Sequence, residues 1–143
     1  GVVTMDSDGQ HDPAEIPQLI RAGELQHAAI VLGNRMSDGT PMPLVRRWTN
    51  RLMSRIVSAV SRQAIPDSQC GFRLIRREVL EQLPLRAQRF EIETELVLAA
   101  ARQRWKIVSV PVQSIYGNHG SHIEPFRESV RFLHVVCRHL LWR

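Results

Sequence analysis

The 143-residue chain has little cysteine, few aromatic residues and no long apolar run. Its two cysteines, Cys70 and Cys137, lie far apart and match no metal-ligand spacing, which predicts buried thiols in a reducing compartment. No apolar stretch approaches the ~18 residues of a membrane-spanning helix, and no secretory signal is visible. With 43% hydrophobic and 23% charged residues, the composition fits one soluble globular domain.

Lysine is almost absent: Lys106 is the only one, and arginine supplies the remaining basic side chains apart from histidine. The formal net charge of +5 favours anionic partners such as nucleotide phosphates, phospholipid head groups or nucleic acid. Aromatic residues make up only 6% of the chain and do not alternate with the arginines as base-stacking platforms would. Nucleic acid is therefore not expected as a partner.

The most informative segment is Asp-Ser-Asp-Gly-Gln-His-Asp at residues 6–12, which follows an apolar strand-like segment at residues 2–5. If the chain stays extended, Asp6, Asp8 and Gln10 point to the same side and converge at the end of that strand. Two carboxylates and an amide oxygen suit Mg²⁺ or Mn²⁺, whose open positions the phosphates of a substrate can fill. The alternative is a simple turn, because aspartate is common in turns.

The next residues have the chemistry of a helix start, with Asp12 as the cap, followed by proline and then glutamate. We expect a helix over residues 13–22 that stops at Gly23, and a buried strand over residues 28–32. This strand–helix–strand order predicts a parallel pair with a right-handed crossover. Asp12 is expected to cap the helix rather than to bind metal.

A long helix is predicted over residues 44–62. Its expected apolar face consists of Val45, Trp48, Leu52, Ile56 and Ala59. A separate stripe contains Arg47, Arg51, Arg55 and Arg62. Such a stripe is usually a solvated helix face, but its first two arginines are candidates for touching an anion.

The second half alternates short strands and helices. Strands are expected over residues 72–75 and 106–116, and helices over 76–83 and from about 90 to 104. Pro111 predicts that the 106–116 strand lies at a sheet edge. The last helix, 125–142, is basic on one stripe and apolar on most others, with Leu133 and Cys137 on its main apolar stripe. It is expected either to rest at a lipid surface or to pack against parts of the chain that are missing here.

These segments, in this order, resemble the family 2 glycosyltransferases of the GT-A fold, especially the dolichyl- or polyprenyl-phosphate sugar synthases and their soluble bacterial relatives. The matching residues are the 6–11 segment, Gly-Asn-Arg at 33–35, the arginine-bearing helix from Arg46, and Asp-Ser-Gln-Cys-Gly-Phe-Arg at 67–73. The match continues with Phe-Glu-Ile-Glu at 90–93 and with residues 110–117. The combination of the first and fourth segments, about sixty residues apart, is the specific part of the resemblance.

The resemblance implies an α/β fold, in which a mixed sheet is flanked by helices and the family's first strands would precede Gly1. Residues 1–143 would then form the metal-binding and acceptor-side portion of one glycosyltransferase domain, inactive on its own. It also implies an inverting transfer from a nucleotide-sugar donor, with Mg²⁺ or Mn²⁺ held by Asp6, Asp8 and Gln10. The cation would neutralise charge on the departing nucleoside diphosphate.

The resemblance further assigns donor or acceptor phosphate contacts to Arg35 and Arg51, with Arg47 close by. Asp67 is the first candidate for a general base or an acceptor-orienting carboxylate, and Glu93 is the second. A sugar hydroxyl needs a base when it attacks, whereas a lipid phosphate is already an anion and does not. The sequence leaves both acceptors open.

The chain departs from the resemblance at Ser121-His122, where lipid-phosphate synthases usually carry Ser-Lys after the Tyr-Gly turn. Phosphate binding by Ser121 and His122 would be weaker or pH-sensitive, because histidine is only partly charged near pH 7. The expected location is the cytoplasm, with peripheral membrane contact through the 125–142 helix. The alternatives are a basic module that binds anionic lipid or nucleic acid, and a metal-dependent nucleotidyltransferase.

Overall fold

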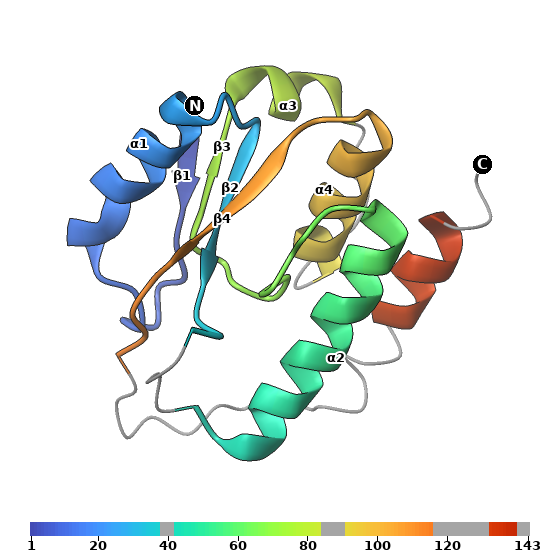
Figure 1. Cartoon of the computed structure of the whole chain (residues 1–143), viewed down its shortest axis with the longest axis horizontal. Coiled ribbons are helices and arrows are strands. Elements are labelled where there is room, and N and C mark those ends of the chain that lie inside the picture. The colour runs from blue at the N-terminus through green and yellow to red at the C-terminus, as the bar shows by residue number, and fades with distance from the viewer. Residues whose placement is uncertain (38–41, 84–90, 116–131, 140–143) are drawn as a thin grey trace.

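The computed structural model describes residues 1–37, 42–83, 91–115 and 132–139, and shows a mixed sheet covered by helices on both faces (Figure 1). The strands are β1 (Val2–Thr4), β2 (Ile30–Asn34), β3 (Arg73–Ile75) and β4 (Ile107–Pro111). The helices are α1 (Ile16–Leu25), α2 (Leu44–Ser61), α3 (Arg77–Gln82) and α4 (Glu91–Arg102). A short 3-10 helix, Pro13–Glu15, precedes α1, and residues 132–139 are also helical.

The strand order is β1-β3-β2-β4, with β3 antiparallel to both of its neighbours and β2 parallel to β4. The predicted pairing of the first two strands was wrong, because β3 lies between them. They still run in the same direction, since both are antiparallel to β3. Their carboxyl ends therefore meet at the same edge of the sheet, and β4 is an edge strand, as Pro111 predicted.

Two buried clusters hold the layers together. On one face, Leu19 of α1 packs with Val31, Phe72 and Val110. On the other, α2, α4 and the 132–139 helix cover the sheet through residues such as Val57, Val97, Phe132 and Val135 (Figure 1). This helix–sheet–helix layering is the arrangement expected of an α/β domain.

The helical segment begins at residue 13 as predicted, but as the 3-10 helix Pro13–Glu15, and α1 itself begins at Ile16. Asp12 accepts a hydrogen bond from Ala14 N at 2.8 Å and so caps the first turn. Gly23 is not a stop, because α1 continues to Leu25. A Cβ at Gly23 would lie 2.9 Å from Leu74 Cδ2, so this position stays small to let the helix approach the sheet.

The apolar face predicted for α2 was wrong. The buried residues of this helix are Asn50, Met53, Ser54 and Val57. Ser54 Oγ accepts a hydrogen bond from Ser68 N at 2.9 Å, so small polar side chains hold α2 against the segment before β3. The expected apolar stripe, from Val45 through Leu52, lies on the outside of the helix.

The 132–139 helix also differs from its predicted pattern. Phe132, Val135 and Val136 are buried, whereas Leu133 is half exposed and Cys137 is exposed. Within these residues the helix packs against the core of this same chain, which neither expectation described. The remainder of the predicted 125–142 helix lies outside the described residues. None of the helices in the described ranges combines the length and apolarity needed to cross a bilayer.

Candidate active site

Charged side chains gather where β1 and β2 end. Asp6 follows β1 by two residues and Arg35 follows β2 directly. The segment that leads into β3 lies between them, because Thr4 Oγ1 donates to Gly71 O at 2.9 Å and Gly33 N donates to Phe72 O at 2.8 Å. This edge of the sheet therefore brings together residues from three distant parts of the sequence.

Asp6 rests directly on Gly71. A Cβ at position 71 would lie within 2.6 Å of the Asp6 carboxylate carbon, closer than any normal contact. The ring of His11 is a second neighbour, with Nε2 3.5 Å from Asp6 Oδ2, a long contact that is electrostatic more than a well-formed hydrogen bond. Interaction with His11 lowers the pKa of Asp6, against the opposing effect of burial, so this half-exposed carboxylate is ionised at neutral pH.

His11 is buried against Phe72, with ring centroids 5.2 Å apart. Its two ring nitrogens form no well-formed hydrogen bond within the described residues. The acidic group that the ring contacts is the carboxylate of Asp6. The Asp6 carboxylate thus has two close neighbours that limit its position, the His11 ring and Gly71.

Arg35 and Asp67 form a completely buried ion pair. Asp67 Oδ2 accepts from Arg35 Nε at 2.8 Å and from Arg35 N at 3.1 Å, while Oδ1 accepts from Nη2 at 3.1 Å. The side chains are 2% and 0% exposed. Both oxygens of Asp67 are engaged by a guanidinium fork, a geometry that holds the two residues in one fixed arrangement.

Arg73 forms a second buried clamp, between the loop before β3 and the first turn of α4. Its guanidinium donates to Cys70 O at 2.6 Å, Ser68 O at 2.9 Å and Glu93 O at 2.8 Å. It also pairs with Glu93 Oε2 at 3.2 Å. Burial raises the pKa of Glu93, although the neighbouring Arg73 acts in the opposite direction.

Cys70 belongs to the same region but is chemically inert. It is fully buried, and desolvation raises the pKa of its thiol to about 12. The prediction of a buried thiol is confirmed for Cys70 and wrong for Cys137, which is exposed.

Asp8 and Gln10 adopt a different geometry from the extended one expected. The chain turns after β1, with Gly9 at φ 74°, and Asp8 Oδ1 accepts a hydrogen bond from Gln10 N at 3.0 Å. Alternation along an extended strand therefore does not bring Asp6, Asp8 and Gln10 together. Asp8 is exposed, and its second carboxylate oxygen does not take part in this turn.

A divalent cation at this turn would have to share its coordination with substrate, because the protein offers few donor atoms there. In the described ranges, no three His, Cys, Asp or Glu side chains gather as a closed metal site. Asp6 and Asp8 instead offer carboxylate oxygens at a solvent-accessible turn, and Asp6 is ionised. Magnesium and manganese favour such sparse oxygen sets, because phosphates and water complete their shell.

The other predicted phosphate contacts are not drawn into this cluster. Arg51 is exposed on α2 and Arg47 is half-buried one turn earlier, whereas Arg35 and Arg73 supply the positive charges that act on Asp6. Ser121 and His122 lie outside the described residues. The sequence reasoning gave no role to Thr4, His11, Gly71 or Arg73, although three of them stand in the two polar segments that it quoted.

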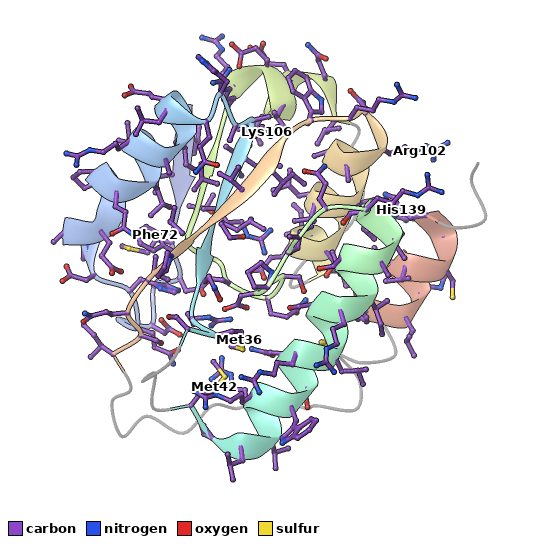
Figure 2. All side chains as sticks on the ribbon, in the orientation of Figure 1. Met36, Met42, Phe72, Arg102, Lys106 and His139 are labelled. Carbon is purple, nitrogen blue, oxygen red and sulfur yellow. The ribbon has the colours of Figure 1, made fainter. Side chains whose placement is uncertain are left out.

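A cavity of about 590 Å³ lies elsewhere, between the carboxyl ends of α2 and α4 and the start of β4. Figure 2 shows three of its lining residues, Arg102, Lys106 and His139, at the opposite end of the molecule from Met36 and Met42, which lie near the end of β2 and the start of α2. Helix carboxyl ends carry partial negative charge, so basic side chains there are explained by the helix dipoles. The cavity is not part of the active-site cluster.

The close contact between Asp6 and Gly71 allows a direct test of metal binding at Asp6. Gly71→Ala should displace the Asp6 carboxylate, because the added methyl group occupies its place. We expect Mn²⁺ affinity, measured by titration calorimetry, to fall about tenfold or more, as for other changes that misorient a metal ligand. Gly33→Ala is the control, since its methyl would press on Phe72 O and Val112 and not on Asp6. Equal metal affinities in the two folded variants would contradict the assignment.

The sequence of the chain is similar to those of known proteins. The profile of Glycosyl transferase family 2 matches residues 2–84, more than half of the chain. A UDP-N-acetylglucosamine–dolichyl-phosphate N-acetylglucosaminyltransferase of Methanococcus voltae is 32% identical over 80% of this chain and 47% of its own length. The polyprenol monophosphomannose synthase of Mycolicibacterium smegmatis is 32% identical over 78% of this chain and 44% of its own.

An undecaprenyl-phosphate mannosyltransferase of Micrococcus luteus is 29% identical over 78% of this chain and 47% of its own length. The chain thus spans about half the length of the curated relatives that it matches. The four-stranded mixed sheet, flanked by helices and with its charged cluster at the carboxyl ends of β1 and β2, is consistent with the GT-A fold that the sequence predicted. The profile match and the relatives show that the chain belongs to glycosyltransferase family 2.

Proposed function

We propose that this chain is the metal-binding and acceptor-side portion of an inverting glycosyltransferase that moves a sugar from a nucleotide-sugar donor to a polyprenyl phosphate. The observation that carries the proposal is the seating of ionised Asp6 on Gly71, beside two buried arginine–carboxylate pairs, at the carboxyl edge of the sheet. Ligands of open α/β sheets bind at this edge. The names of the similar proteins support the acceptor class.

Asp6 and Asp8 would hold Mg²⁺ or Mn²⁺, with Gln10 as the further oxygen donor that the family resemblance suggests. When bound, the cation would stabilise negative charge on the departing nucleoside diphosphate. His11 and Gly71 fix the Asp6 carboxylate, so that its orientation does not have to be set when substrate arrives.

Arg35 and Asp67 are proposed as a positioning pair rather than as a phosphate contact and a general base. The side chains are almost completely buried, and the Asp67 oxygens already accept from the Arg35 guanidinium. A base must have a lone pair within reach of the proton that it removes. Glu93, the second candidate, is paired with Arg73.

Both candidate bases are paired with arginines, Asp67 with Arg35 and Glu93 with Arg73. This pairing favours a lipid phosphate over a sugar hydroxyl as the acceptor. A hydroxyl must lose a proton as it attacks, whereas a phosphate oxygen is already negative near neutral pH. An acceptor that carries its own charge needs no free base in this cluster. Arg47 and Arg51 are proposed to meet such phosphates only if α2 approaches the bound substrates, because Arg51 is exposed in the structure.

The proposal is tested with the full-length protein, a panel of nucleotide sugars, and either polyprenyl phosphate or soluble glycans as acceptor. We expect sugar transfer to the lipid phosphate in the presence of Mg²⁺ or Mn²⁺ and loss of transfer in excess chelator. Transfer only to glycans would overturn the acceptor assignment. Full activity in chelator would overturn the metal assignment, and labelled donor recovered only as a nucleotidyl product would point to a nucleotidyltransferase.

A further inference from the structure

The outer face of α2 carries large apolar side chains that no part of the described structure covers. Leu44, Val45, Trp48 and Leu52 are 72%, 78%, 68% and 61% exposed. At 3.6 residues per turn, their mean direction lies about 180° from the buried face of the same helix. This helix buries a half-polar face and exposes its leucines and tryptophan. A helix face that contacts only water rarely carries such a group of large apolar side chains.

A row of arginines runs beside this apolar face. Arg47, Arg51 and Arg55 stand three residues after Leu44, Trp48 and Leu52, which places each on the adjacent side of the helix. The 18 residues of α2 contain no aspartate or glutamate. The helix thus combines an exposed apolar stripe with a row of arginines and has no acidic residue of its own.

The first half of α2 lies at the same end of the molecule as the charged cluster. Figure 1 shows the helix beginning below the carboxyl end of β2 and running up past the sheet. Its middle is fixed to the segment around Asp67 by the hydrogen bond from Ser68 N to Ser54 Oγ, at 2.9 Å. Whatever binds the outer face of α2 is therefore held near the active-site edge.

We propose that the outer face of α2, formed by Leu44, Val45, Trp48 and Leu52 with the flanking Arg51 and Arg55, docks on a membrane surface that contains anionic phospholipid. Leucine and tryptophan side chains would enter the boundary between head groups and acyl chains. The arginines, with apolar stems and charged ends, would reach the lipid phosphates.

Charge complementarity favours this occupant over a second copy of the chain. Self-association through the same face would bring two arginine rows together, and like charges in contact oppose association. The contact also differs from the one expected at residues 125–142, because residues 132–139 pack into the core through Phe132, Val135 and Val136. The proposal goes beyond the proposed function, since vesicle binding can be measured without donor or metal.

The test is flotation of the intact protein with vesicles of phosphatidylcholine, either alone or mixed with phosphatidylglycerol. Leu52→Glu should weaken binding to the mixed vesicles about tenfold, because a charge replaces an exposed leucine that would otherwise enter the membrane surface. Leu25→Glu is the matched control, since Leu25 is 75% exposed at the end of α1 and lies outside the docking face. It should bind like the unmodified protein.

A second pair of variants tests the charge. Arg55→Gln should reduce binding to the mixed vesicles about fivefold and leave binding to pure phosphatidylcholine unchanged, whereas Arg21→Gln on α1 should change neither. Failure of the unmodified protein to float, or equal losses for Leu52→Glu and Leu25→Glu, would overturn the proposal. So would a dimer that Leu52→Glu converts to a monomer, because the face would then join two copies of the chain.

Discussion

Asp67→Asn is expected to lower the free energy of unfolding by about 3–5 kcal/mol, the usual cost of removing one partner from a buried ion pair. Asparagine has one oxygen where Asp67 has two, so the three donors of Arg35 would no longer be satisfied. The guanidinium, 2% exposed, would remain charged with no countercharge from this partner. Urea denaturation measures the difference.

Two controls separate this effect from a general sensitivity to amide substitution. Glu81→Gln removes the partner of Arg77 in an exposed pair of similar geometry, at 2.7 Å, and should cause no resolvable loss of stability. Arg35→Met combined with Asp67→Asn should be more stable than Asp67→Asn alone, because it removes the stranded charge. A loss below about 1 kcal/mol for Asp67→Asn would show that Arg35 finds water, and would contradict the buried pair.

The same variants distinguish a positioning role from catalysis by Asp67. If Asp67 removed a proton from the acceptor, no second substitution at Arg35 could restore turnover. If it holds the loop in place, the double variant should recover part of the activity lost in the single one. The pH dependence of the remaining activity should also keep the shape seen in the unmodified protein.

The local elements of the fold could be predicted because their signals are local. The cap at Asp12, the edge position implied by Pro111 and the order of helices and strands each depend on a few neighbouring residues. Strand pairing depends on residues far apart, and no local pattern indicated that β3 lies between β1 and β2. Three-residue strands such as β1 and β3 carry too few side chains to specify a partner.

The error on α2 has a different cause. Helical periodicity identifies an apolar stripe but does not say which face meets the protein. Here Ser54 and Asn50 face inward, where the hydroxyl of Ser54 bonds the backbone of Ser68, and Trp48 faces outward. The departure from the usual pattern is the feature that points to an external contact for this helix.

The candidate site residues were proposed from the family resemblance and their chemistry, while their pairing came only from the structure. Arg35 and Asp67 are 32 residues apart, and nothing local indicates that they engage each other. Asp6 and Gly71 are likewise brought together by the β1–β3 pairing. The roles predicted for Arg35 and Asp67 at the substrate remain predictions, and the structure adds that the two side chains engage each other.

Asp8→Asn is expected to reduce metal-dependent sugar transfer by the full-length protein about a hundredfold or more. A metal ion that stabilises a leaving group contributes several kcal/mol, and each ~1.4 kcal/mol corresponds to a tenfold change in rate. Asparagine keeps the side-chain oxygen that accepts from Gln10 N, so the turn after β1 should survive. Only the negative charge offered to the cation is lost.

Asp12→Asn is the matched control for this prediction. Asp8 and Asp12 are both exposed, and each accepts a hydrogen bond from the backbone N–H two residues later, at 3.0 and 2.8 Å. The two substitutions therefore make the same chemical change in the same local structure, and both proteins should keep their stability because asparagine also caps well. Transfer rates and Mn²⁺ affinity should fall for Asp8→Asn alone. Equal effects at the two positions would place the cation elsewhere, because the local turns would then account for the whole loss.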